Sequence, residues 1–156
     1  MNLRVLFAWG IAFAVTFWLT PRMMRLAGRT GMVKKPGGRH IHLKPTPLLG
    51  GLAMFAGIEL AAMLLAPNIA LGLALPLAMG AGLVDDYCKC HGADLPALPK
   101  LVLQFLPATV LVAFGYTIDH VSNPFGPGML ILPTWIDIPL TIAWLVGMTN
   151  AINFLD

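Results

Sequence analysis

The chain alternates long apolar stretches with short polar segments. Five of the apolar stretches approach the roughly 20 residues that a helix needs to cross about 30 Å of hydrocarbon. They cover residues 3–20, 48–66, 67–84, 101–118 and 137–155. This pattern predicts an all-α, polytopic integral membrane protein, in which residues 1–156 form a single transmembrane domain of about five helices.

Two of the connecting segments also carry a structural signal. Only the three residues 66–68, Ala-Pro-Asn, separate the second stretch from the third, which predicts a tight helical hairpin. Residues 119–136 contain too many prolines and glycines for a helix. We expect this segment to form a short extended loop or β-hairpin around the sequence Asn-Pro-Phe-Gly-Pro-Gly.

Composition supports a membrane protein. Hydrophobic residues make up 58% of the chain and charged residues 11%, against roughly 25% charged residues in soluble domains. The mean hydropathy is +0.79. The first stretch runs into the basic segment "TPRMMRLAGR" without a small-residue cleavage pattern, so we expect an uncleaved anchor. Two cysteines, Cys88 and Cys90, are too few and too close for a disulfide framework.

The distribution of lysine and arginine predicts the orientation. Seven of the ten basic residues follow the first apolar stretch, and Lys89 and Lys100 lie between the third and the fourth. The connections 66–68 and 119–136 contain none. By the positive-inside rule the basic loops are cytoplasmic and the N-terminus is outside. The first, third and fifth helices then end at the cytoplasmic face.

Carboxylates and amides collect at this same face. Asp85 and Asp86 follow the third stretch, and Asn150, Asn153 and Asp156 are spaced three residues apart at the end of the fifth. Helix C-termini carry partial negative charge, which the three aspartates would reinforce. Oxygen ligands without histidine or cysteine favour a hard ion, so the pattern predicts a site for Mg²⁺ or Mn²⁺.

An anion site is expected beside this cation site. The second and fourth helices begin at the cytoplasmic face, next to the basic loop and Lys100. A divalent metal beside an anion pocket at headgroup depth suits phosphoryl transfer at a membrane surface. Plainer interpretations stay open: carboxylates at a helix end can be solvated caps, and Asn150 and Asn153 can join helices to one another.

Four motifs then carry a family resemblance. In chain order they are "KPGGRHIHLKPTPLLGG" (35–51), "GLVDD" (82–86), "KLVLQ" (100–104) and "NAINFLD" (150–156). Their order and spacing resemble the N-terminal half of the polyprenyl-phosphate N-acetylhexosamine-1-phosphate transferases, the glycosyltransferase 4 family. The resemblance covers nearly the whole chain but only about half of the family fold.

The resemblance implies an activity and a set of site residues. The enzyme would move an N-acetylhexosamine-1-phosphate, with N-acetylglucosamine favoured, from a UDP-sugar to undecaprenyl phosphate, and so start cell-envelope glycan synthesis with release of UMP. The motif matches imply catalytic roles for Asp85 and Asp86 and a metal-ligand role for Asp156. The residues implied to bind substrate are Asn150, Asn153, Lys100, Arg39 and His42.

The resemblance also implies partners and a location. These are Mg²⁺ or Mn²⁺, the lipid bilayer, undecaprenyl phosphate and a UDP-N-acetylhexosamine, with no nucleic acid, and related enzymes suggest a homodimer. The site would face the cytoplasm from the inner membrane of a bacterium. The Arg-x-x-His pattern formed by Arg39 and His42 is closer to the UDP-N-acetylglucosamine branch than to the UDP-MurNAc-pentapeptide translocase, which remains the alternative within the family.

The chain departs from the family pattern in three places. Lys89 occupies a position where some members have a third aspartate, and Lys34 one where aspartate is common. The family sequence also continues beyond the "NAINFLD" motif, so we expect this chain alone to turn over poorly or not at all. The rival to an active enzyme is an incomplete fragment, or a small non-enzymatic membrane protein or transporter that uses the mid-span acid Glu59.

Overall fold

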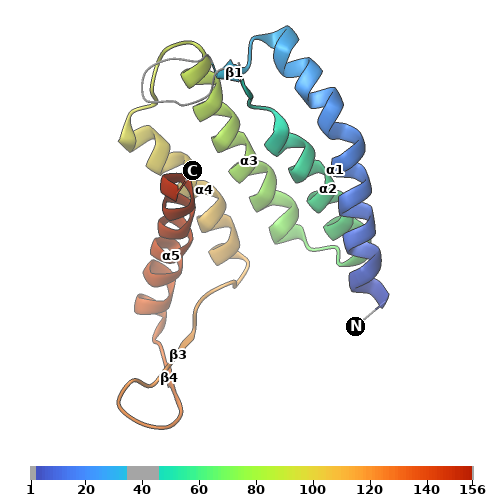
Figure 1. The fold of residues 1–156 in the computed structure, drawn as a ribbon. Helices are drawn as coiled ribbons and strands as arrows, with labels where there is room; N and C mark the ends of the chain where they lie inside the picture. Colours follow the sequence, from blue (N-terminus) through green and yellow to red (C-terminus); the bar gives the residue numbers. More distant parts are fainter. Residues whose placement is uncertain (1–2, 35–45, 156) are drawn as a thin grey trace.

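The computed structural model describes residues 3–34 and 46–155, and this part of the chain contains five helices and two small antiparallel sheets (Figure 1). In chain order the elements are α1 (Leu3–Thr30), β1 (Val33–Lys34), β2 (Thr46–Pro47), α2 (Gly50–Leu65), α3 (Ile69–Cys90), α4 (Ala97–Ala113), β3 (His120–Ser122), β4 (Met129–Ile131) and α5 (Thr134–Leu155). Three of the predicted site residues, Arg39, His42 and Asp156, therefore lie outside the described residues.

The helices form an all-α bundle of the kind expected for a polytopic membrane protein. By length and composition α1, α3 and α5 could each cross a membrane, whereas α2 and α4 are shorter apolar helices. Large apolar side chains such as Phe13, Phe17 and Trp144 are exposed on the surface of the bundle. This distribution suits a lipid environment, and the predicted fold class is confirmed.

The interior of the bundle is built from small residues. Of the eight buried hydrophobic residues in the described part of the chain, six are alanines: Ala27, Ala53, Ala61, Ala70, Ala74 and Ala108. Lipid tails are as apolar as leucine, so helices in a bilayer gain more from close backbone approach than from burying large side chains. Small residues permit that approach.

The tightest approach joins α1 and α2 at Gly57. A Cβ atom added to Gly57 would lie 2.5 Å from the backbone oxygen of Ala12 and 2.5 Å from Oγ1 of Thr16. The Thr16 hydroxyl also donates a hydrogen bond to the carbonyl of Ala53, at 3.4 Å. A glycine is therefore required at position 57 for the two helices to pack as they do.

Both predicted hairpins are present. Residues 66–68 join α2 to α3, and the Asn68 side chain caps α3 by accepting a hydrogen bond from the Leu71 amide at 3.3 Å. The same side chain bonds the Tyr116 hydroxyl, beyond the end of α4. Between α4 and α5, strands β3 and β4 pair antiparallel around the central pair Val121 and Leu130, which confirms the predicted β-hairpin.

The C-terminal ends of two helices differ from the expectation. Helix α1 continues to Thr30, and in its added part Arg22 and Arg25 donate hydrogen bonds to carbonyls of the preceding turn. Helix α3 continues to Cys90, where Gly92 follows with a positive φ of 76°. The prediction that Asp85 and Asp86 follow the end of the third helix is therefore wrong, because both lie within α3.

Candidate functional site

A groove of about 1120 Å³ opens where α3 ends and α4 begins. Strand β1 and helices α3, α4 and α5 supply its walls. Its apolar lining includes the small residues Ala78, Ala81 and Gly82 of α3. The polar side chains that line it are Lys34, Asp85, Asp86, Lys89, His91, Asp94, Lys100, Gln104, Thr149 and Asn153.

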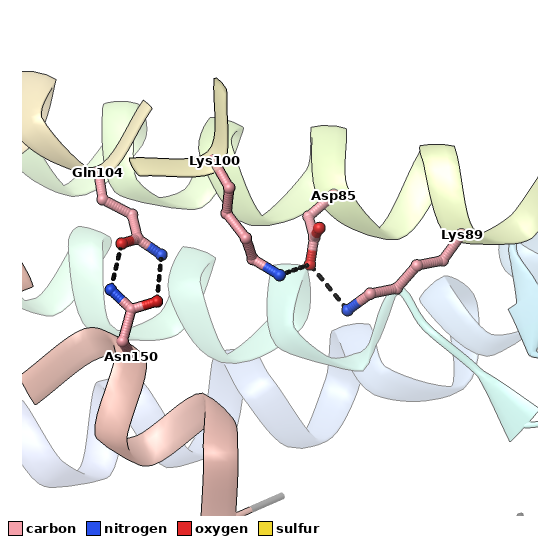
Figure 2. A network of polar contacts seen from close by, with 5 residues as sticks. All are labelled: Asp85, Lys89, Lys100, Gln104 and Asn150. Atoms are coloured by element: carbon pink, nitrogen blue, oxygen red, sulfur yellow. Dashed lines mark hydrogen bonds and ion pairs between the residues drawn. The ribbon is translucent and has the colours of Figure 1, made fainter. Parts of the chain in front are cut away.

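Asp85 holds two ammonium groups at the centre of this groove. Its Oδ2 atom lies 2.7 Å from Nζ of Lys89, one turn along α3, and 3.0 Å from Nζ of Lys100 at the start of α4 (Figure 2). Its other oxygen, Oδ1, is buried and has no hydrogen-bond partner among the described residues. Asp85 thus joins α3 to α4 and neutralises part of the positive charge of the two lysines.

Asp86 differs from its neighbour. It also lines the groove, but it makes no ion pair or side-chain hydrogen bond with the part of the chain that the structure describes. Its side chain is half-buried, whereas Asp85 is only 8% exposed. Of the two adjacent carboxylates, Asp86 has both oxygens without an ion pair among the described residues, whereas Asp85 has only its buried Oδ1.

Gln104 and Asn150 form a reciprocal pair of amide hydrogen bonds between α4 and α5 (Figure 2). Nε2 of Gln104 donates to Oδ1 of Asn150 at 3.3 Å, and Nδ2 of Asn150 donates to Oε1 of Gln104 at 2.5 Å. Asn150 Nδ2 donates in addition to the carbonyl of Val146 at 2.8 Å. We call this pair the amide clasp.

The structure brings together most of the described residues that the sequence marks as site residues. Asp85, Asp86, Lys100 and Asn153 all line the groove. Asn150 does not belong to the lining residues, because its amide is turned toward Gln104.

Two residues of the site were not assigned a role from the sequence. Lys89 appeared only as a departure from the family pattern, although its spacing of four residues from Asp85 on one helix face indicates an ion pair. Gln104 appeared only within a motif, although the same spacing places it on the face of α4 that carries Lys100.

The donor set suits a hard divalent cation in its chemistry. Asp85 and Asp86 offer carboxylate oxygens, the ligands that Mg²⁺ prefers, and Oδ1 of Asp85 has no partner among the described residues. Within residues 3–34 and 46–155, no group of three histidine, cysteine, aspartate or glutamate side chains could hold a metal ion. The third carboxylate expected at such a site, Asp156, lies outside this part of the chain.

Known proteins resemble the chain over almost its entire length. A probable undecaprenyl-phosphate N-acetylglucosaminyl 1-phosphate transferase of Bacillus subtilis is 32% identical over 161 residues, covering 99% of this chain and 43% of the relative. A decaprenyl-phosphate N-acetylglucosaminephosphotransferase of Mycobacterium tuberculosis is 36% identical over 159 residues, covering 93% and 38%. A phospho-N-acetylmuramoyl-pentapeptide-transferase of Desulforamulus reducens is 34% identical over 168 residues, covering 94% and 50%.

These relatives are longer than this chain, which spans about two fifths of the first two and half of the third. The family model for glycosyl transferase family 4 matches residues 68–156, from the cap of α3 to the end of the chain. The matched range contains Asp85, Asp86, Lys100, Gln104 and Asn153, which line the groove, and Asn150 behind it. The resemblance expected from the motifs is confirmed, and the chain belongs to glycosyl transferase family 4.

Proposed function

We propose that this chain forms the groove of a membrane transferase that moves N-acetylglucosamine-1-phosphate from a UDP-sugar to undecaprenyl phosphate, with release of UMP. The observation that carries the proposal is the groove itself, where an available carboxylate lies beside two ammonium groups at one end of a membrane bundle. The printed names of the Bacillus and Mycobacterium relatives support this activity. The reaction would start the synthesis of a cell-envelope glycan.

The two lysines suit a phosphate group. Lys89 and Lys100 both contact one oxygen of Asp85. The distance between their two Nζ atoms therefore cannot exceed the sum of these two contact distances. Oxygens of a single phosphate can bridge two cations at such a separation. A lysine ammonium keeps further N–H donors after one contact with a carboxylate, so both lysines can hold Asp85 and a phosphate together.

Asp86 would act on the reacting phosphates. In the proposed reaction an oxygen of the lipid phosphate forms a bond to the β-phosphorus of the UDP-sugar, and the bond from that phosphorus to the bridging oxygen breaks to release UMP. Asp86 would accept the proton of the lipid phosphate and, with Asp156, hold Mg²⁺ or Mn²⁺. When bound, the cation would supply positive charge to the diphosphate as negative charge develops on the leaving group.

The other site residues would bind the donor. Asn153 lines the groove from α5, and Arg39 and His42 would contact phosphates from the segment between β1 and β2. With this arrangement the groove opens to the cytoplasm, the N-terminus of α1 lies outside the inner membrane, and a second copy completes a homodimer.

The observed position of the polar residues favours the transferase over a transporter. A transporter places its binding site near the midplane, on interrupted helices. Here the groove residues gather at one end of the bundle. Glu59 in α2 is the mid-span exception, and its Oε2 atom is buried without a hydrogen-bond partner in the described part of the chain.

A transfer assay in membranes tests the proposal. Membranes that contain the chain receive radiolabelled UDP-N-acetylglucosamine, undecaprenyl phosphate and Mg²⁺, with and without the separately expressed C-terminal part of the Bacillus relative. We expect lipid-linked product with both parts present, and at least a hundredfold less with Asp86→Asn. Arg29→Gln, which removes an exposed charge from α1 outside the groove, is the matched control and should leave the rate unchanged.

Two outcomes would contradict the proposal. Product from UDP-MurNAc-pentapeptide but not from UDP-N-acetylglucosamine would assign the chain to the other branch of the family. Absence of product from both donors, with the two parts folded together, would reject the transferase.

Mg²⁺ should also raise the unfolding temperature of the solubilised chain, and equal shifts in the parent and in Asp156→Asn would exclude Asp156 as a ligand.

A further inference from the structure

We infer that Gln104 contacts the UDP-sugar in the groove, and that Asn150 is a positioning residue that acts by orienting Gln104. This inference rests on the proposed function for the identity of the ligand. It differs from what the motif alone implies, since the motif implies that Asn150 binds the substrate and gives Gln104 no role.

The hydrogen bonds of Asn150 leave it without a donor for a substrate. An asparagine amide has two N–H donors and one carbonyl oxygen. Nδ2 of Asn150 donates to Oε1 of Gln104 and to the carbonyl of Val146, so both donors are in use. Its Oδ1 accepts from Gln104. Phosphate groups need donors, and Asn150 could offer one only by breaking a bond that it already makes.

Gln104 keeps the capacity that Asn150 lacks. Its Nε2 donates one hydrogen bond to Asn150, so its second N–H remains unused within the described residues. In a reciprocal amide pair this second hydrogen is the one directed away from the partner. Gln104 lines the groove. The unused N–H is thus available to an oxygen acceptor in the groove.

The position of Gln104 on α4 suits a phosphate or sugar oxygen. Lys100 lies one turn away on the same face of α4 and has its ammonium group in the groove (Figure 2). An amide donor beside an ammonium group can bind neighbouring oxygens of one sugar phosphate. On α5, Asn153 follows Asn150 by one turn and lines the same groove. The amide clasp therefore lies next to the polar groups that would hold the donor, and its Gln104 is one of them.

The clasp fixes Gln104 through two hydrogen bonds, which are the polar side-chain contacts that α4 and α5 make at this level in the described part of the chain. One turn farther from the groove, Ala108 on α4 and Val146 on α5 are both buried, so the helices are packed together there by apolar residues. A glutamine in a partly buried helix interface has three rotatable side-chain bonds. Two hydrogen bonds to Asn150 hold it in one orientation before a ligand arrives, which lowers the entropic cost of binding.

Two measurements on the same variants test the inference. The variants are Gln104→Leu, Asn150→Leu and the double substitution. Thr109→Val is the matched control, because among the described residues the exposed Thr109 hydroxyl bonds only a carbonyl of its own helix turn. The first measurement is the unfolding equilibrium of the chain in detergent. Each single change should shift it by about three- to twentyfold, the range of hydrogen bonds between membrane helices, and the double change by less than the product.

The second measurement is the affinity for UDP-N-acetylglucosamine in nanodiscs. Gln104→Leu should weaken binding by at least about tenfold, the effect of losing a hydrogen bond to a charged group. Asn150→Leu should weaken it by a smaller factor. Added to Gln104→Leu, the Asn150 change should cause no further loss, because Asn150 acts only through Gln104. A purely structural role would not produce this coupling in affinity.

The outcomes separate the inference from the proposed function. If the two losses of affinity multiply, or if Asn150→Leu causes the larger loss, Asn150 contacts the donor itself and the inference is overturned. A folded parent chain that binds no UDP-sugar would overturn the proposed donor, and the contact of Gln104 with it. Unfolding shifts that simply multiply would reject the amide clasp whichever donor binds.

Discussion

Replacing Asp85 with asparagine separates the charge of this residue from its shape. The substitution keeps the size of the side chain but removes the negative charge that holds Lys89 and Lys100 (Figure 2). We expect two effects of opposite sign. The folded state becomes less stable, because two ammonium groups remain close together, and an added polyanion stabilises it more than it stabilises the parent chain.

The size of the first effect follows from the exposure of the two ion pairs. The pair with Lys89 joins residues four apart on one helix, and the Lys89 side chain is 38% exposed, so this pair contributes only about 0.3–0.5 kcal/mol. The pair with Lys100 joins two helices, with side chains 26% and 11% exposed. A charged hydrogen bond in such a setting contributes about 1.5–3 kcal/mol. The contact between helices dominates, and the total loss is about 2–3 kcal/mol.

The assay follows unfolding of the detergent-solubilised chain through its tryptophan fluorescence, with and without inorganic pyrophosphate and with no divalent metal. A loss of about 2–3 kcal/mol lowers the folding equilibrium constant by roughly 30- to 150-fold. Pyrophosphate can occupy the position of the lost carboxylate charge between the two lysines. Its stabilising effect should therefore be larger in Asp85→Asn than in the parent.

Asp94→Asn is the control. Asp94 lines the same groove, is exposed, and makes no ion pair with the described residues, so its replacement changes the charge of the groove without breaking a contact. It should change stability by no more than about 0.5 kcal/mol. If Asp85→Asn is no more destabilising than Asp94→Asn, or if pyrophosphate stabilises both equally, the two lysines do not depend on Asp85 and the reasoning fails.

Three further predictions concern helix packing, a helix cap and the membrane topology. Gly57→Ala should destabilise the chain by about 1–3 kcal/mol in a denaturant titration, because the added methyl group meets the backbone of α1, whereas Gly51→Ala, which has open space, should be neutral or stabilising. Asn68→Ala should lower the unfolding free energy by about 1 kcal/mol through loss of the helix cap, and an unchanged value would show that the cap contributes nothing. In intact cells and in a background without native cysteines, an impermeant thiol reagent should label Ser122→Cys and not Gly38→Cys, and the reverse pattern would invert the topology.

The sequence predicts the helices because their signal is local. Long apolar stretches, the Ala-Pro-Asn connection and the prolines and glycines of 119–136 each act within a few residues, and the structure has the corresponding helices and hairpins. The C-terminal ends of α1 and α3 extend beyond the predicted apolar stretches, because these turns carry basic and other polar residues that interrupt the hydrophobic pattern. Side chains in these turns contact the preceding turn of the same helix, as Arg22 and Lys89 do.

The sequence also predicts that several polar residues of the groove lie at one face of the bundle, but it does not predict how they pair. Successive helices cross the membrane in alternating directions. The order of the helices therefore predicts, without any knowledge of packing, that Asp85, Lys100 and Asn153 lie at one face. Whether Asn150 bonds a substrate or Gln104 depends on the rotation of α5 against α4, which no local pattern encodes. The partners of Asp85 and Asn150 therefore required the structure.

The short turn at residues 66–68 connects two packed groups of helices. Polar contacts tie α3 to α4 near both ends, through Asp85 with Lys100 and through Asn68 with Tyr116. Helix α5 is tied to α4 through the amide clasp and to Ile118, beyond the end of α4, through Thr141. Helix α2 packs on α1. The three residues 66–68 connect α2 to α3, and so to the group formed by α3, α4 and α5.

The turn lies at the end of α2 opposite the groove, whose wall includes Leu48 just before α2 and Lys34 in β1. A helix of 16 residues such as α2 is about 24 Å long. A rotation of about 5° at the turn would move the Leu48 end by about 2 Å, comparable to a hydrogen-bond length. A change in this angle would therefore displace one wall of the groove from the opposite end of α2, and it would strain the contact that the Cys90 thiol makes with the Val33 carbonyl in the groove.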